Sequence, residues 1–242
     1  MAELSRREVE AFRRDGFVRL EQAFPRSLAL RCRDLLWEQI DEDPADASTW
    51  RRPVVRVGSQ TDRAFSDAAQ APRWVNAIKE LIGPNADPTP WMGGTFAIRF
   101  PVDADPGDDG WHIEGSYLGP DGWWWTNYWS KERALLMLVL FSDIAVTDAP
   151  TRIRVGSHVF LPEALAPYGD AGVNQRDLRL PPAVDDCDMA LATGQPGDVY
   201  LCHPFLVHAA QRHRGTEPRF IAQPGVPWKI DGRLNGLWPA RT

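Results

Sequence analysis

A change in the spacing of apolar residues near residue 91 constrains the fold of this chain more than any other feature of its sequence. Before it, apolar residues recur at helical spacing, and after it the chain breaks into short runs separated by Gly, Pro and Asp. Many short strands after an α-rich start fit a double-sheet jelly roll buttressed by helices. We therefore predict a mixed, mainly β fold, a double-stranded β-helix (jelly roll) with N-terminal helices, in one domain over residues 1–242.

Three helices are expected in the N-terminal third. The first begins with a capping box formed by Ser5 and Glu8 and ends at Gly16. The second spans Ser27 to about Ile40, and the third runs from about Ala71 to Leu81. Strands are expected at Thr95–Phe100, Leu135–Phe141, Ile153–Val155, Asp198–His203, Leu206–Gln211 and Arg219–Gln223.

The composition is that of an ordinary globular protein, with 43% apolar and 25% charged residues. The formal net charge of −6 argues against nonspecific nucleic-acid binding, which needs clustered Lys and Arg. No run approaches the roughly 18 apolar residues of a membrane span, and the polar N-terminus lacks the apolar segment of a signal peptide. The three scattered cysteines are typical of reduced thiols. We expect a cytoplasmic monomer or homodimer without nucleic-acid or membrane partners.

His112 and Glu114 are separated by one residue, so on an extended strand both side chains point to the same face. Two imidazoles and one carboxylate form the facial triad of non-heme Fe(II) oxygenases, which leaves coordination positions open. The second imidazole must come from a distant strand. His208 can supply it, and His203, at the end of a predicted strand, is the competing candidate. Taken alone, His112 and Glu114 also fit a surface hairpin with polar residues facing outward.

Two arginines are candidates for binding a carboxylate. Arg219 lies eleven residues beyond His208, and its guanidinium fork suits the far carboxylate of a bound 2-oxo acid. The alternative for Arg219 is a surface ion pair. Arg99 alternates with Ile98 and Phe100 on a predicted strand. It points either into the barrel, toward a carboxylate of the substrate or of the 2-oxo acid, or to solvent.

Several motifs occur in a familiar order. They are Asp15-Gly16-Phe17, Trp111-His112-Ile113-Glu114, Gly156-Ser157-His158, and a closing segment with Gly197-Asp198, His203-Pro204, His208 and Pro218-Arg219. With these motifs the chain resembles, over nearly its whole length, the phytanoyl-CoA dioxygenase family of Fe(II)- and 2-oxoglutarate-dependent oxygenases. It departs at Glu114, where the family's usual carboxylate is Asp.

The resemblance implies that His112, Glu114 and His208 hold Fe(II), and that 2-oxoglutarate chelates the iron while Arg219 pairs with its 5-carboxylate. With O2, the implied reaction hydroxylates or otherwise oxidises an unactivated C–H of a small molecule, such as a natural-product or amino-acid-derived substrate, and releases succinate and CO2. Glu114 argues against a related halogenase, in which chloride takes the place of the carboxylate. The remaining alternative is a cupin-like metal-binding isomerase or binding protein that does not use 2-oxoglutarate.

Residues 108–129 hold five tryptophans among Gly, Asp and Pro. Loops of this kind often carry function on a rigid scaffold. Trp123, Trp124 and Trp125 are therefore candidates for a lid or an apolar wall around the substrate. Packing against the helices and an oligomer interface are the alternatives. Of the other histidines, His158 is expected to have a structural or supporting role, and His213 to lie in a solvated turn.

Overall fold

A computed structural model of the chain describes residues 3–83 and 92–228. The helices are α1 (Arg6–Asp15), α2 (Arg26–Trp37), α3 (Arg63–Ala69), α4 (Pro72–Ile82) and α5 (Leu161–Leu165). The strands are β1 (Phe17–Leu20), β2 (Val54–Val57), β3 (Thr95–Arg99), β4 (Tyr117–Leu118), β5 (Trp124–Thr126), β6 (Leu135–Leu140), β7 (Arg152–Arg154), β8 (Val173–Asn174), β9 (Met189–Leu191), β10 (Val199–Cys202), β11 (His208–Ala209), β12 (Arg219–Gln223) and β13 (Gly225–Val226).

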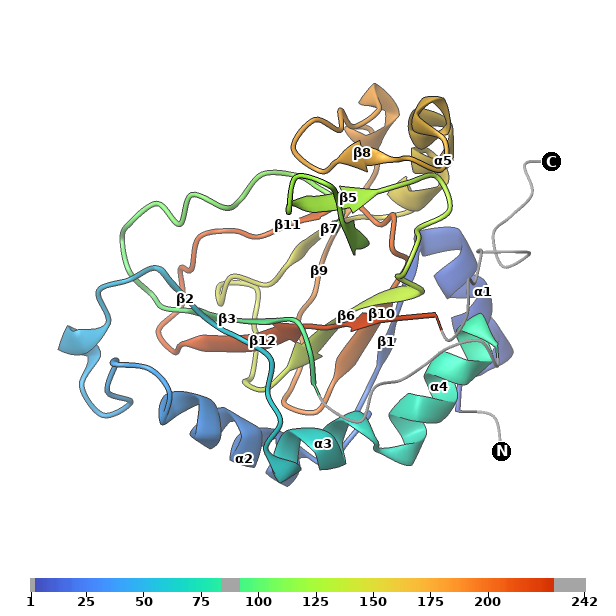
Figure 1. The fold of residues 1–242 in the computed structure, drawn as a ribbon. Coiled ribbons are helices and arrows are strands. Elements are labelled where there is room, and N and C mark those ends of the chain that lie inside the picture. Colours follow the sequence, from blue (N-terminus) through green and yellow to red (C-terminus); the bar gives the residue numbers. More distant parts are fainter. Residues whose placement is uncertain (1–2, 84–91, 229–242) are drawn as a thin grey trace.

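The strands form one large sheet and two small ones. The large sheet has the order β1-β10-β6-β12-β3-β2, with β13 also pairing with β6, and its neighbouring strands are antiparallel. The small sheets have the orders β11-β7-β9 and β4-β5-β8. Helices α2, α3 and α4 cover one side of the large sheet, and the small sheets lie on its other side (Figure 1). This is the predicted double-stranded β-helix with N-terminal helices.

Strand β6 shows how the layers are held together. Its sequence is apolar throughout, and each of its residues is buried. Its odd-numbered residues belong to the core cluster that includes α2, α3 and α4, while its even-numbered residues pack with Ile153 and Leu206 on the opposite side. A short, uninterrupted apolar run bounded by turns is the pattern of a strand that is buried on both faces.

Helix α1 is attached to the barrel at its C-terminal end. The capping box is present, since Ser5 Oγ accepts from Glu8 N–H and the Glu8 carboxylate accepts from Ser5 N–H. Gly16 ends the helix at φ 82°, and a Cβ at this position would lie 2.5 Å from Nδ1 of His158. The backbone N–H of His203 donates to the Gly16 carbonyl at 2.8 Å. Gly16 is therefore required both by its left-handed conformation and by the close approach of His158.

The predicted helices and strands were confirmed, although their bounds differ. Several described elements were not predicted, namely helices α3 and α5 and strands β2, β4, β5, β8, β9 and β13. The second helix ends at Trp37 rather than near Ile40. Helix α3 has only 7 residues and begins at Arg63, after the N-cap residue Asp62, whose side chain accepts from Ala64 N–H. The predicted strand Leu206–Gln211 is reduced to His208–Ala209. None of the described helices is long and apolar enough to cross a membrane.

Candidate metal centre

Two histidines from distant parts of the chain are joined directly through their backbones. The N–H of His112 donates to the carbonyl of His208, and the N–H of His208 donates to the carbonyl of His112, both at 3.0 Å. Antiparallel partners that exchange both hydrogen bonds present their side chains on the same face. The two imidazole ring centroids accordingly lie 4.6 Å apart. The main chain thus sets the spacing of the two imidazoles.

Each imidazole is held in the same tautomer by the carbonyl two residues before it. His112 Nδ1 lies 2.8 Å from the Gly110 carbonyl oxygen, and His208 Nδ1 lies 3.0 Å from that of Leu206. A carbonyl oxygen only accepts, so Nδ1 carries the hydrogen and Nε2 presents a lone pair. This is how a backbone carbonyl orients a metal-binding histidine. Nε2 of His208 is buried and makes no hydrogen bond within the described residues.

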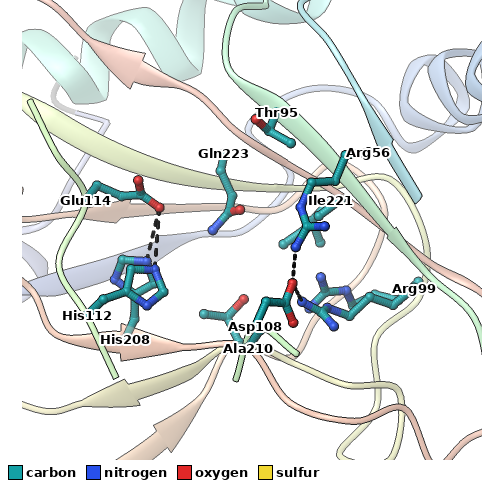
Figure 2. A pocket seen from close by; sticks show the side chains of 13 residues that line it. Arg56, Thr95, Arg99, Asp108, His112, Glu114, His208, Ala210, Ile221 and Gln223 are labelled. Carbon is teal, nitrogen blue, oxygen red and sulfur yellow. Dashed lines mark hydrogen bonds and ion pairs between the residues drawn. The ribbon is translucent and has the colours of Figure 1, made fainter. Parts of the chain in front are cut away.

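Glu114 completes the cluster (Figure 2). Its Oε1 lies 3.8 Å from Nε2 of His112 and 3.5 Å from Nε2 of His208. Burial raises the pKa of Glu114, but the two imidazoles beside it and the charge of Arg133 hold that pKa well below its usual value. The potential ligand atoms of the three residues lie within 4.8 Å of one another. Two imidazole lone pairs and an ionised carboxylate on one side of a site fit Fe(II).

The three residues open onto a cavity of about 230 Å³. Glu114 and the histidines lie on one side of it, Arg56, Asp108 and Arg99 lie on the other, and Gln223 lies between them (Figure 2). Alternate residues of two paired strands line it, as the period of a strand requires. They are Thr95, Ala97 and Arg99 on β3 and Arg219, Ile221 and Gln223 on β12.

Arg219 is a buried cation in this wall, only 1% exposed, so it does not form the surface ion pair that its sequence left open. Its Nη1 donates to the Ala149 carbonyl, while its Nε makes no hydrogen bond within the described residues. Burial, and next the charge of Arg99, lowers the pKa of Arg219 well below its usual value. A buried guanidinium without a carboxylate partner in the described part of the chain is a ready site for an anionic ligand.

Arg99 also faces the cavity and is 3% exposed. Its Nη2 lies 2.6 Å from Oδ2 of Asp108, and the same oxygen accepts from Arg56. Because Asp108 precedes the His112 motif by four residues, this pair of contacts fastens the ligand-bearing segment to strands β2 and β3. Neither Asp108 nor Arg56 was among the residues predicted from the sequence.

The other histidines lie elsewhere. His203 Nδ1 accepts from the Phe205 N–H at 2.8 Å, and its ring packs 4.7 Å from that of His158. His158 Nε2 in turn lies 3.1 Å from the Arg13 carbonyl oxygen of α1. This places His158 and His203 at the attachment of α1. His213 is 7% exposed and accepts from the Gly215 N–H, so the prediction of a solvated turn is wrong for its side chain.

The three tryptophans proposed to contact substrate point to different surroundings. Trp124 lines a second cavity, described below. Trp123 lies under the guanidinium of Arg176, 3.5 Å from its carbon to the ring centroid. Trp125 Nε1 donates to the Asp121 carboxylate at 2.8 Å. Trp123 and Trp125 line neither the metal-site cavity nor this second cavity.

The model for the family described as "Phytanoyl-CoA dioxygenase (PhyH)" matches residues 12–221. The chain belongs to this family. It is accordingly an Fe(II)- and 2-oxoglutarate-dependent oxygenase, as its resemblance implied, with Fe(II) and 2-oxoglutarate as cofactor and co-substrate. Among curated protein sequences, none matches the chain significantly.

Several solved structures share the fold at low identity. One is HygX from Streptomyces hygroscopicus with nickel, 2-oxoglutarate and hygromycin B bound, at 16% identity and a TM-score of 0.59 over 94% of this chain and 88% of that one. Another is the carbocyclase SnoK from nogalamycin biosynthesis, at 14% identity and a TM-score of 0.65 over 93% and 84%. A third is EctD from S. alaskensis with bound Fe, at 18% identity and a TM-score of 0.61 over 100% and 83%.

Proposed function

We propose that this oxygenase hydroxylates, or otherwise oxidises, an unactivated C–H bond of a small molecule and releases succinate and CO2. His112, Glu114 and His208 would hold the iron. The observation that carries this proposal is the pair of imidazoles that exchange backbone hydrogen bonds, share one tautomer and converge with a carboxylate. The proposal takes residues 1–242 as one domain, because lining residues from Arg56 to Gln223 meet in a single cavity.

Arg219 would pair with the 5-carboxylate of 2-oxoglutarate, and Arg99 would add a second positive charge beside it. Both guanidinium groups line the same cavity as the three metal ligands. One small dianion in this cavity can therefore contact the metal with one carboxylate and the arginines with the other. A guanidinium fork binds a carboxylate through two parallel hydrogen bonds. The burial of Arg219 favours this role over the alternative of a metal-binding isomerase or binding protein that does not use 2-oxoglutarate.

When bound, iron and 2-oxoglutarate activate O2, so that one oxygen atom enters succinate and the other oxidises the substrate. The chain would orient the metal ligands and enclose the reacting groups. The carbonyls of Gly110 and Leu206 keep both Nε2 lone pairs aimed at the metal position. Glu114 occupies the place that chloride would need in a halogenase, which supports oxidation without halogenation. Strands β3 and β12 form one wall of the cavity in which the reacting groups would lie.

A small natural product is the proposed class of substrate. The structure of HygX holds hygromycin B, and that of SnoN, of the same fold, holds nogalamycin RO, so the fold accommodates such molecules. SnoN matches at 17% identity and a TM-score of 0.62, over 92% of this chain and 82% of that one.

The test is Fe(II)- and O2-dependent turnover of 2-oxoglutarate labelled at its 1-carboxylate, measured as labelled CO2 and as succinate. Oxygenases of this kind turn over slowly without substrate, so the assay does not need the substrate's identity. Wild type should release CO2 and succinate in equal amounts, and Glu114→Ala should release neither above background. Equal release by the two proteins, or none by wild type with iron bound, would overturn the proposal.

A further inference from the structure

A second cavity, of about 530 Å³, lies next to the metal centre. Its wall includes Tyr117, Trp124 and Trp228 as aromatic surfaces, with Arg133 and Gly225 beside them. A volume of this size suits a small molecule. Nothing in the proposed binding of iron and 2-oxoglutarate occupies it.

The two cavities are separated by a single layer of chain. Thr95 lines the first and Gly94 the second, and the same holds for Gln223 and Gly225. At Gly94 a Cβ would lie only 2.4 Å from the Gln223 carbonyl oxygen, so these two segments touch between the cavities. The metal ligand Glu114 faces the first cavity, and Ser116, two residues later, faces the second. A molecule in the second cavity would therefore lie beside the iron ligands.

Arg133 stands at this boundary. Its Nη2 donates to the Gly115 carbonyl at 2.8 Å, immediately after Glu114. Its Nη1 lies at the cavity wall against Gly225, where an added Cβ would be 2.8 Å away. Within the described residues, neither Nε nor Nη1 makes a hydrogen bond, and no carboxylate lies within 4.0 Å of the guanidinium. The nearby Glu132, which also lines the cavity, instead pairs with Lys131 at 3.7 Å.

The charges that line the two cavities leave an excess of one positive charge, although the chain as a whole carries −6. Four arginines line them, and three carboxylates oppose these. Binding Fe(II) and the dianion of 2-oxoglutarate adds no net charge, so the loaded site stays cationic by one unit. Burial lowers the pKa of Arg133, and the negative charge of Glu114 opposes this shift. Once Glu114 is committed to the metal, Arg133 has the least compensated charge at the boundary.

We propose that the second cavity is a binding site for a monocarboxylate whose carboxylate pairs with Arg133 while a ring or apolar body lies against Trp124. This inference rests on the proposed function, because it takes the first cavity to be filled by 2-oxoglutarate. Trp124 is 43% exposed, so its ring is free to be covered. The absence of a Cβ at Gly225 lets the Arg133 guanidinium lie against this wall of the cavity.

The test uses three probes that share one body and differ in charge: 3-phenylpropanoate, its primary amide and 3-phenylpropylamine. The full chain is loaded anaerobically with Fe(II) and saturating 2-oxoglutarate, and each probe is titrated while tryptophan fluorescence and the visible iron–2-oxoglutarate band are recorded. The carboxylate should bind about ten- to a hundredfold more tightly than the amide, as expected for hydrogen bonds to a charged group. The amine should bind more weakly than the amide.

Variants assign the effect to the second cavity. Arg133→Gln should abolish the preference for the carboxylate with iron and 2-oxoglutarate still bound, and Arg133→Lys should restore part of it. As a control, Arg6→Gln removes a positive charge from a side chain that is 95% exposed and lines neither cavity, and it should leave the preference intact. Trp124→Leu should weaken all three probes equally, whereas Trp123→Leu should not change their affinity.

Several results would overturn the inference. They are equal affinity for the three probes or no binding by wild type, an unchanged preference in Arg133→Gln, and loss of iron from that variant in step with loss of the probe, which would make Arg133 a support for Glu114. A probe that displaces 2-oxoglutarate and bleaches the band would place its binding in the first cavity, with the same consequence. If the band never forms in wild type, the proposed function fails instead, so the two failures are distinguishable.

Discussion

Arg99 and Arg219 stand directly opposite each other on the antiparallel strands β3 and β12, and both side chains are buried in the wall of the metal-site cavity. Like charges facing each other across a ladder destabilise a sheet. Only Arg99 has a carboxylate partner, Asp108, within the described residues. We infer that the repulsion between the two arginines destabilises the unliganded protein and that a dianionic ligand offsets it on binding.

Replacing Arg219 by Met should therefore stabilise the unliganded protein while it abolishes 2-oxoglutarate binding. A buried, unpaired cation gives way to an apolar side chain, and the expected gain in unfolding free energy is about 1–3 kcal/mol. Urea denaturation measures it, with Arg6→Met, at a side chain that is 95% exposed, as the control. Metal plus 2-oxoglutarate should stabilise wild type more than metal alone, by mass action. The same increment in Arg219→Met would show that Arg219 does not bind the co-substrate.

Asp108→Asn should have the opposite effect on the unliganded fold. The substitution keeps the shape of the side chain but removes the negative charge that Arg99 and Arg56 share. We expect a loss of about 1–3 kcal/mol in unfolding free energy, less than for a fully buried pair because Arg56 is half exposed. The control is Asp103→Asn, which removes an exposed partner of Arg212. Equal losses in the two variants would mean that Asp108 is an ordinary surface acid.

Glu114→Asp should weaken iron binding even though Asp is the family's usual residue. In this chain the longer side chain brings Oε1 to 3.5 Å from Nε2 of His208, and a shorter one would draw the oxygen back from both imidazoles. We expect the dissociation constant for Fe(II) to rise about tenfold, equivalent to about 1.4 kcal/mol, and to rise further in Glu114→Ala. Anaerobic metal titration measures both. An affinity of Glu114→Asp equal to or above that of wild type would contradict this geometry.

The metal-free protein should lose stability as the pH falls from about 6.5 toward 4. Burial lowers the pKa of His158 to about 4, while an unfolded histidine titrates near 6.5. Between these values the unfolded chain binds a proton that the native state excludes, so unfolding becomes easier in acid. The contribution of His158 is up to about 3 kcal/mol. His203 acts in the same direction, since burial and the neighbouring His158 hold its pKa well below the usual value.

The measurement for this pH effect is the free energy of unfolding in urea at pH 7, 6 and 5. His158→Gln, whose amide can still donate to the Arg13 carbonyl, should show a shallower dependence on pH than wild type. An identical slope in the two proteins would mean that His158 is not the group that takes up the proton on unfolding.

The local parts of the site could be predicted from the sequence. His112 and Glu114 converge on one site, as their spacing predicted, although only His112 pairs, in an isolated bridge with His208 and not in a strand. Gly16 ends a helix whose start carries a capping box. Gln223 could have been added by the same rule, because it follows Arg219 and Ile221 at the same period on β12. Choosing His208 over His203 depended on the family resemblance. The structure gives the physical distinction, since His203 accepts a hydrogen bond in its own turn beside α1.

Some site residues could not be predicted, because tertiary structure brings them to the site and the sequence around them shows no pattern that marks them. Asp108 lies in a polar loop and matters only because β2 and β3 bring Arg56 and Arg99 to it. Arg133 follows Lys131 and Glu132, and three consecutive charged residues are typical of an exposed turn. Its place beside Glu114 depends on the pairing of β6 with β13. The tryptophan cluster was visible as composition, but which ring faces a cavity depends on the small sheet formed by β4, β5 and β8.

The most direct measurement is an anaerobic titration of Fe(II) into protein with saturating 2-oxoglutarate, followed by the visible charge-transfer band of the chelated 2-oxo acid and by iron content. Wild type should reach one iron per chain with the band. His203→Asn should do the same, because an amide oxygen can still accept from the Phe205 N–H. His208→Ala, checked for folding by circular dichroism, should show neither tight iron nor the band. Full iron and an unchanged band in His208→Ala, with loss of both in folded His203→Asn, would contradict the assignment of His112, Glu114 and His208 as the metal ligands.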